Sequence, residues 1–237
     1  AQAINAMLDR INEAYRSQMR FVSDASHELR TPIAVIQGYA NLLNRWGKDD
    51  PATRQEAIDA IRQEADSMKE LVEQLLFLAR GDNDSMHIEM ETFDLTEVAA
   101  EVLKETGMID QTHTFSARCE GAVPVCADVG LTKQALRILV DNSIKYTPAG
   151  GHITLSAALR DGMARLSVQD EGQGIDAGSL PHVFDRFFTS DKMRTGRNTG
   201  LGLAIVKALA GQMDCRAEAA LEGDMFAITL RWPVERR

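Results

Sequence analysis

The side chains best suited to chemistry in this sequence lie together in residues 21–32, Phe-Val-Ser-Asp-Ala-Ser-His-Glu-Leu-Arg-Thr-Pro. His27 offers a nucleophilic imidazole, Glu28 a carboxylate that can take a proton, and Thr31 a hydroxyl one helical turn away. Pro32 follows, although proline inside a helix costs about 3 kcal/mol and removes a backbone hydrogen bond. A lone surface histidine is usually an ordinary solvated residue, but this combination beside a proline indicates a functional position.

A heptad repeat of apolar residues predicts the helix that carries His27. Its apolar residues are Leu8, Ile11, Tyr15, Val22, Ala25, Leu29, Ile36, Tyr39 and Leu43, and with Gln18 and Pro32 at the two remaining positions they alternate steps of three and four. His27 then falls at position f, farthest from a partner helix, so we expect its imidazole to be exposed. A second repeat follows: Ile58, Ile61, Ala65, Met68, Val72, Leu75 and Ala79. Asp50 and Pro51 are suited to begin that helix, and Thr53 with Glu56 is a competing capping box.

We expect the first helix to end near Trp46 and the second near Arg80, with a polar linker over residues 81–86. Two antiparallel helices cannot bury both apolar stripes alone, so a homodimer that forms a four-helix bundle is expected. An intramolecular coiled-coil hairpin used as a spacer is the alternative. The repeat is already running at Ile4 without an N-cap, which predicts that the helix continues upstream in the native protein.

The composition is that of a globular protein, with 237 residues, 44% hydrophobic residues and a net charge of -9. This length allows one large domain or two modest ones. The negative charge argues against a nucleic-acid partner, which would require clustered Lys and Arg. No apolar run approaches the roughly 18 residues of a membrane span. Cys119, Cys126 and Cys215 have unrelated spacings, so we expect buried thiols in a reducing compartment and no disulfide framework or zinc site.

After residue 86 the pattern changes from heptads to short strands and helices. We expect strands or short alternating segments over 87–93, 112–118, 123–127, 152–160, 164–170, 216–221 and 225–231. Helices are expected over 95–106, 131–146 and 202–213. The dipeptide Asp161-Gly162 predicts a tight hairpin turn. Helices mixed with mainly antiparallel strands predict an α+β sandwich.

Two polar segments of this second half are suited to a nucleotide. Asn142 and Lys145, at the end of a predicted helix, offer an amide oxygen for a hard cation such as Mg²⁺ and an ammonium for phosphate. Asp170 follows a predicted strand, where its carboxylate can accept hydrogen bonds from an amino group. Gly172 and Gly174 would let a flat ring approach the backbone.

Two further segments complete the pattern. Residues 184–188, Phe-Asp-Arg-Phe-Phe, gather aromatic rings around one arginine. Residues 196–203, Gly-Arg-Asn-Thr-Gly-Leu-Gly-Leu, form a glycine-rich loop that runs into a helix, whose N-terminus favours phosphate. Each segment alone has an ordinary explanation as a helix cap, a turn, a core cluster or a flexible loop. The four in this order, after the segment around His27, are much stronger evidence together.

In these segments the chain resembles the catalytic core of bacterial sensor histidine kinases of two-component systems. Residues 21–32 resemble the phosphoacceptor box, and the N, G1, F and G2 boxes of the family are matched by residues 142–147, 170–174, 184–188 and 196–203. Residues 3–11 resemble the end of a HAMP signalling linker. The sequence departs from the family at Ile138, where a second asparagine is common, and in its last glycine-rich segment, where only Gly223 is recognisable.

The resemblance implies three parts and an α+β fold. Residues 1–20 would be the end of a HAMP-like coiled-coil signalling helix. Residues 21–85 would be the dimerisation and histidine phosphotransfer domain, an antiparallel helical hairpin that forms a dimeric four-helix bundle. Residues 86–237 would be the catalytic α/β-sandwich ATP-binding domain.

The resemblance also implies residue roles. His27 would be the phosphoacceptor, Glu28 would take the imidazole proton, and Thr31 would help to orient water in a phosphatase reaction. Asn142 would coordinate Mg²⁺, and Asp170 would bind the adenine amino group. The other expected ATP-binding residues are Lys145, Tyr146, Gly172, Gly174, Ile175, Arg186, Phe187, Gly196, Thr199, Gly200, Leu201, Gly202 and Leu203. A mobile lid over ATP would span residues 176–199.

The activity implied is ATP-dependent autophosphorylation of His27, with ATP and Mg²⁺ as cofactors, and phosphoryl transfer to an aspartate of a response regulator receiver domain. Phosphatase activity toward that regulator would accompany it. The protein would be a homodimer without a nucleic-acid partner, the cytoplasmic portion of an inner-membrane bacterial sensor attached only through upstream segments. Two alternatives stay open: a degenerate kinase that serves as a dimeric scaffold or phosphatase-only regulator, and an ATPase of the class that includes DNA gyrase, heat-shock-90 chaperones and mismatch-repair enzymes.

Overall fold

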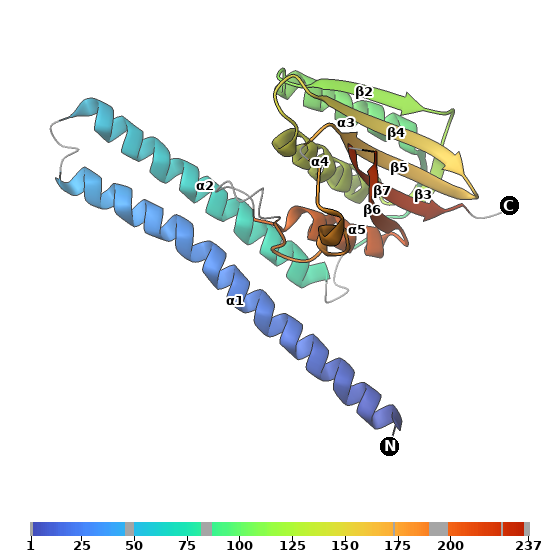
Figure 1. Ribbon diagram of the computed structural model, residues 1–237, viewed down its shortest axis with the longest axis horizontal. Helices are drawn as coiled ribbons and strands as arrows, with labels where there is room; N and C mark the ends of the chain where they lie inside the picture. Colours follow the sequence, from blue (N-terminus) through green and yellow to red (C-terminus); the bar gives the residue numbers. More distant parts are fainter. Residues whose placement is uncertain are drawn as a thin grey trace. The chain divides into compact units, whose positions relative to one another are not determined.

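The structure, a computed structural model, describes residues 2–45, 50–81, 87–172, 174–189, 199–223 and 225–234. The chain forms two compact units, residues 1–77 and residues 78–237 (Figure 1). The predicted linker over 81–86 lies outside the described residues except for Gly81.

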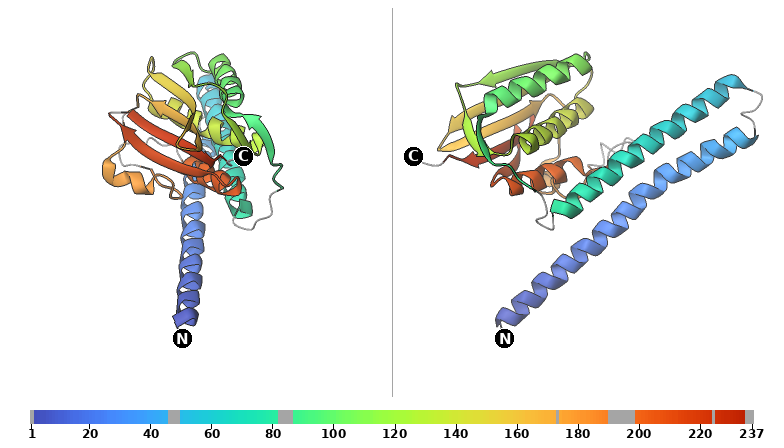
Figure 2. Two further views of the ribbon diagram at one scale, coloured as in Figure 1. Left: turned by 90° about the vertical axis from the view of Figure 1, so that its right-hand side faces the viewer. Right: turned by 180° about the vertical axis from the view of Figure 1, so that it is seen from behind.

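Two long helices, α1 (Gln2–Arg45) and α2 (Pro51–Gly81), run antiparallel and side by side, as Figures 1 and 2 show. The predicted helical hairpin is confirmed. Asp50 accepts hydrogen bonds from the Ala52 N–H (3.0 Å) and the Thr53 hydroxyl, so Asp50 begins α2 and the competing capping box is not used. Neither helix, over its described residues, is long and apolar enough to cross a membrane.

Within one protomer, the most buried residues of α2 are not those of the repeat that is predicted to face the partner helices. Ala57 and Leu71 are buried, whereas Ile58 and Val72, which belong to the predicted repeat, are 39% and 41% exposed. Within one protomer, only one side of the apolar surface of α2 is buried, and the adjoining side is exposed to solvent. α1 likewise exposes large apolar side chains, namely Ile4, Met7, Leu8, Ile11, Tyr15, Met19 and Val22. The hairpin therefore leaves apolar surface uncovered on both helices.

A five-stranded sheet with the strand order β2-β4-β5-β7-β6 organises the second unit (Figure 1). Its strands are β2 (Thr114–Cys119), β4 (His152–Arg160), β5 (Met163–Asp170), β6 (Arg216–Glu222) and β7 (Met225–Pro233). β2 pairs in parallel with β4, and the other pairs are antiparallel. Asp161 and Gly162, with φ of 54° and 71°, make the predicted tight turn between β4 and β5.

Three helices, α3 (Leu95–Ile109), α4 (Val129–Tyr146) and α5 (Gly202–Gln212), cover one face of this sheet (Figure 2). Leu155, Val168 and Ile228 lie in register on neighbouring strands and are buried. Ser167 points to the opposite face, where its hydroxyl lies 2.7 Å from that of Thr229. This alternation gives the predicted two-layer α/β sandwich, with its core between the sheet and the helices.

Short elements complete the second unit. β1 (Glu91–Asp94) and β3 (Pro124–Ala127) pair in a separate two-stranded sheet, and residues Ala177–His182 form a 3₁₀ helix, η1. Asp94 and Asp128 cap α3 and α4, since their carboxylates accept hydrogen bonds from the N–H groups of Thr96 and Leu131, each at 2.9 Å. These caps fix where both helices begin.

The expectation of buried thiols is right for Cys215 and wrong for Cys119 and Cys126, which are exposed on β2 and β3. Cys119 is the last residue of the edge strand β2, and Cys126 alternates with the buried Val125 and Ala127 on β3, so both point away from the core.

Candidate functional site

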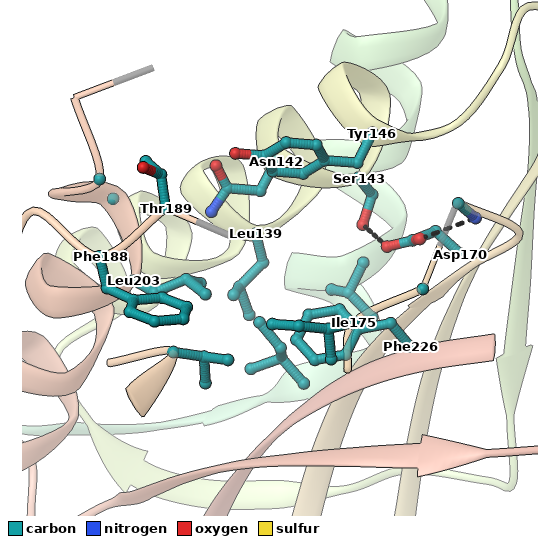
Figure 3. A pocket seen from close by; sticks show the side chains of 17 residues that line it. Leu139, Asn142, Ser143, Tyr146, Asp170, Ile175, Phe188, Thr189, Leu203 and Phe226 are labelled. Atoms are coloured by element: carbon teal, nitrogen blue, oxygen red, sulfur yellow. Dashed lines mark hydrogen bonds between the residues drawn. The ribbon is translucent and has the colours of Figure 1, made fainter. Parts of the chain in front are cut away.

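A pocket lies in the second unit where α4, α5, β5 and β7 meet (Figure 3). α4 contributes Asn142, Ser143 and Tyr146, whose side chains project from its last turns. The floor is apolar and comes from the sheet, from α4 and from the segment that follows β5. Its apolar residues are Leu139, Val168, Ile175, Val183, Phe226 and Ile228. A flat aromatic ligand would fit this combination of an apolar floor and a few polar groups at one end.

The polar end of the pocket is built around Asp170, the last residue of β5, which is only 6% exposed. Its Oδ2 accepts a hydrogen bond from the Ser143 hydroxyl (2.7 Å), and its Oδ1 accepts one from the Gly172 N–H (3.0 Å). Burial raises the pKa of Asp170, and these two hydrogen bonds oppose that rise by stabilising the ionised form. The result is a buried acceptor that faces the pocket.

Two of the predicted glycines are required by close contacts. A Cβ at Gly172 would lie 2.6 Å from Asp170 Oδ1, so a larger residue would displace the carboxylate. Gly200 has φ of 64°, and its Cβ would lie 2.6 Å from the carbonyl carbon of Phe187. Phe187 itself has φ of 62°, which is unusual for a bulky residue. The glycine-rich segment thus packs its backbone directly against the aromatic segment.

The structure brings nine predicted residues to the wall of one pocket: Asn142, Tyr146, Asp170, Gly172, Gly174, Ile175, Gly200, Gly202 and Leu203. Five other predicted residues do not line it. Lys145 is exposed, Arg186, Phe187 and Thr199 are partly buried, and Leu201 lies in the core. Gly196, and with it most of the predicted lid beyond residue 189, lies outside the described residues.

Sequence reasoning missed the role of Ser143 and most of the apolar floor. Ser143 has a recognisable signal, because it continues the buried stripe of α4 formed by Thr132, Leu136 and Leu139 at steps of four and three. A polar residue on such a stripe needs a buried partner, and here the partner is Asp170. The floor residues carry no signal of their own, since apolar strand residues read as core.

Asn142 is the residue that fits a magnesium ion. It lines the pocket, and a Cβ at Gly202 would lie 3.3 Å from its Nδ2 and 3.5 Å from its Oδ1. Ile138, at the position of the expected second asparagine, offers only a methyl group to the same glycine, with its Cγ2 at 3.3 Å. Over the described ranges, no group of three or more His, Cys, Asp or Glu side chains could hold a metal. One amide oxygen together with phosphate oxygens is a donor set that suits Mg²⁺.

The second set of predicted residues lies on α1. His27, Glu28 and Thr31 are all exposed, as the heptad position of His27 predicts. α1 continues through Pro32 without a break in its helical assignment. Ser26, next to His27, directs its hydroxyl to the carbonyl of Val22 (2.7 Å). The imidazole is therefore open to solvent on the surface of a helix.

Two known families match the regions that contain these residues. The His Kinase A (phospho-acceptor) domain family matches residues 17–84, and the family of histidine kinase-, DNA gyrase B-, and HSP90-like ATPases matches residues 127–236. The chain belongs to the sensor histidine kinases. The first range contains His27, Glu28 and Thr31, and the second contains the residues that line the pocket.

Individual histidine kinases align along most of the chain. Sensor histidine kinase YkoH of Bacillus subtilis is 40% identical over 210 residues, which cover 88% of this chain and 46% of that protein. The chain thus spans about half the length of the curated relatives it matches. The structure of Acinetobacter baumannii histidine kinase AdeS superposes with a TM-score of 0.68 at 26% identity, covering 89% of this chain and 98% of that one.

A histidine kinase solved in complex with its response regulator, ThkA with TrrA, has the same fold. Its TM-score is 0.74 at 23% identity, with 95% of this chain and 66% of that chain covered. The chain therefore shares its fold with solved histidine kinases, one of which is in complex with a response regulator.

Proposed function

We propose that this chain binds ATP in the pocket of its second unit and phosphorylates its own His27. The observation that carries the proposal is the presence, in one sensor histidine kinase chain, of an exposed His27–Glu28 pair and of a pocket with a buried acceptor, Asp170. A regulator-binding scaffold would need the exposed helix but not the pocket. An ATPase of the gyrase class would need the pocket but not the histidine.

Adenine fits the polar end of the pocket. The Asp170 carboxylate would accept hydrogen bonds from the 6-amino group, and Tyr146 and Ile175 would lie beside the ring. The phosphates would extend toward the start of α5. Its capping residue, Leu201, provides no side-chain hydrogen bond, so the first N–H groups of the helix are available to an anion. Asn142 lies beside that end, 3.3 Å from the Cβ position of Gly202.

When bound, Mg²⁺ would neutralise phosphate charge, with Asn142 as the residue that holds it. The reaction joins an imidazole nitrogen of His27 to the γ-phosphorus and breaks the bond between that phosphorus and the β–γ bridging oxygen, so ADP leaves. The proton lost by the imidazole passes to the Glu28 carboxylate, its neighbour on α1. Because His27 is exposed, ATP held by the second unit of the same or the partner subunit can reach it.

Other parts of the function follow from the exposed surfaces. The uncovered apolar side chains of α1 and α2 would pack against a second copy of the hairpin, which gives the homodimer and its four-helix bundle. A receiver domain of a response regulator would then take the phosphoryl group from His27 onto an aspartate, since ThkA is solved with such a regulator. Thr31, exposed on the same helix, would help to orient the water that hydrolyses the regulator's phosphoaspartate when the protein acts as a phosphatase. Membrane attachment would depend on segments upstream of this chain.

The test is incubation with γ-labelled ATP and Mg²⁺, comparing the unchanged chain with His27→Gln and with His87→Gln. His87 is a matched control, because its side chain is 89% exposed in the second unit and away from the pocket lining. We expect acid-labile, alkali-stable label on the unchanged chain and on His87→Gln, and none on His27→Gln. Label that persists in His27→Gln would contradict the assignment.

The degenerate-kinase alternative has one observation in its favour, the apolar Ile138 beside Gly202. It predicts that all three proteins bind ATP and that none becomes labelled. Release of labelled phosphate without any labelled protein would instead favour the ATPase alternative. The same incubation thus separates the three functions.

A further inference from the structure

Ser143 and Asp170 form a buried pair at the polar end of the pocket. Ser143 is 4% exposed and Asp170 is 6% exposed, and both line the pocket. Figure 3 shows the Ser143 side chain pointing from α4 toward the carboxyl group of Asp170, with which it makes a hydrogen bond of 2.7 Å. The pair links α4 to the end of β5, two elements that are distant in sequence.

The chemistry of the pair fixes the direction of this hydrogen bond. An ionised carboxylate can only accept, so the Ser143 hydroxyl must donate its single proton to Asp170. The serine oxygen then has only lone pairs left for a ligand. The other Asp170 oxygen accepts a hydrogen bond from the Gly172 N–H, and its remaining lone pair can likewise only accept. A bound base therefore meets acceptors from both residues at this end of the pocket.

We propose that Ser143 is a positioning residue that makes this pocket select purines with a 6-amino group over purines with a 6-oxo group. It acts through Asp170, because its hydroxyl donates a hydrogen bond to the carboxylate and holds that carboxylate in one orientation. The inference rests on the proposed function, since it assumes that the pocket holds the purine ring of a nucleotide. An amino group donates to the acceptor pair, whereas a 6-oxo group would face it with another acceptor and leave buried lone pairs unpaired.

The same geometry predicts the effect of replacing an acceptor of this pair with a donor. In Asp170→Asn the new amide oxygen can keep the hydrogen bond from the Gly172 N–H, and the amide nitrogen then faces Ser143. The serine oxygen becomes the acceptor, so its proton is released toward the pocket. The pocket would then present donors from Ser143 and from the amide, which suit a 6-oxo purine.

The experiment measures equilibrium binding of three nucleotides to the full chain by calorimetry. ATP carries the 6-amino group, purine riboside triphosphate lacks it, and inosine triphosphate has a 6-oxo group. The variants are Ser143→Ala and Asp170→Asn, with Ser156→Ala as the control, because Ser156 lies on the sheet face away from the helices and outside the pocket lining. Thermal unfolding of each variant establishes that it is folded.

We expect Ser143→Ala to weaken ATP binding about tenfold while purine riboside triphosphate binds within about threefold of its original affinity. Asp170→Asn should lose the preference for ATP and bind inosine triphosphate more tightly than the unchanged chain does. Ser156→Ala should match the unchanged chain for all three nucleotides.

Three results would overturn the proposal. Equal weakening of ATP and purine riboside triphosphate in Ser143→Ala would make Ser143 a structural residue only. An unchanged ATP affinity in that variant would remove any role. If Ser143→Ala does not fold, a retained preference of Asp170→Asn for ATP over inosine triphosphate decides against the acceptor pair. An unchanged chain that binds no nucleotide at all would instead refute the proposed function, and this inference with it.

Discussion

Replacing Gly200 with alanine tests the packing at the base of the pocket most directly. Gly200 has φ of 64°, a conformation that L-residues other than glycine rarely adopt. An added Cβ would lie 2.6 Å from the Phe187 carbonyl carbon, 2.8 Å from its Cα and 2.8 Å from the Phe188 carbonyl oxygen. All three are backbone atoms, so no side-chain rotation can relieve the contact. The backbone of one segment or the other must move.

The size of the effect follows from two separate costs. Placing alanine in the left-handed region costs about 1–2 kcal/mol. Forcing a methyl group against packed atoms costs about 1–3 kcal/mol. Phe187 has little freedom to give way, because its own φ of 62° is already strained for an aromatic residue. We therefore expect Gly200→Ala to lower the free energy of unfolding of the second unit by about 2–5 kcal/mol.

Urea denaturation, followed by circular dichroism, measures the free energy of unfolding, and titration with ATP measures the affinity of the pocket for the nucleotide. Gly211→Ala is the matched control, because Gly211 lies near the end of α5 and has no atom within 4 Å of its Cβ position. That change should be neutral or stabilise by up to about 1 kcal/mol. If Gly200→Ala unfolds at the same urea concentration as the unchanged chain and binds ATP equally well, the packing argument is wrong.

Three further predictions concern the second unit outside the pocket. His113 Nδ1 lies 2.6 Å from Asp110 Oδ2 and its Nε2 lies 3.0 Å from the Thr147 carbonyl oxygen, so both nitrogens face acceptors and these contacts favour the imidazolium form of the ring. Burial lowers the pKa of His113, but these hydrogen bonds outweigh that effect and raise the pKa. The stabilisation of the folded state by His113 is therefore complete below about pH 6.5 and is lost as pH rises through the raised pKa. Urea denaturation across pH should show this loss of stability, and His113→Gln should abolish the pH dependence. Asp94→Ala should lower the free energy of unfolding by about 1–2 kcal/mol, because one carboxylate oxygen accepts two backbone N–H groups, and an unchanged urea midpoint would contradict that role. Lys133→Ala should cost less than about 1 kcal/mol in the same assay, since its ion pair with α3 is solvent-exposed, and a larger loss would mean that the pair is not screened.

The sequence predicts those features that depend on local pattern. Both long helices follow from their apolar repeats, and the start of α2 follows from Asp50 and Pro51. The β4–β5 hairpin follows from a dipeptide that tolerates positive φ. In the pocket, Asp170 and the glycines can be predicted because they come where a predicted strand or helix begins or ends. An ordinary turn at these places would need neither a buried carboxylate nor close backbone contact.

What the sequence does not predict depends on contacts between distant segments. The parallel pairing of β2 with β4 joins strands separated by β3 and α4, and no local pattern specifies that neighbour. The pocket floor is made of strand residues such as Phe226 and Ile228, which look like ordinary core. Which flank of α2 is buried within one protomer is not specified by the apolar repeat, and the exposed Ile58 and Val72 of that repeat stay available to the predicted partner helices of a dimer.

The two sites differ in burial, and this difference has a chemical reason. Selection of a nucleotide needs desolvated groups, because the penalty for an unpaired buried acceptor is what rejects a wrong base, and Asp170 is 6% exposed. In the proposed function the acceptor histidine has the opposite requirement, because the same imidazole would meet ATP when it is phosphorylated and a regulator when it gives the phosphoryl group away. A buried His27 could not serve two large partners in turn, whereas an exposed helix residue can. With specificity in the second unit and the reactive nitrogen on α1, as proposed, each site would have the solvent exposure that its chemistry needs.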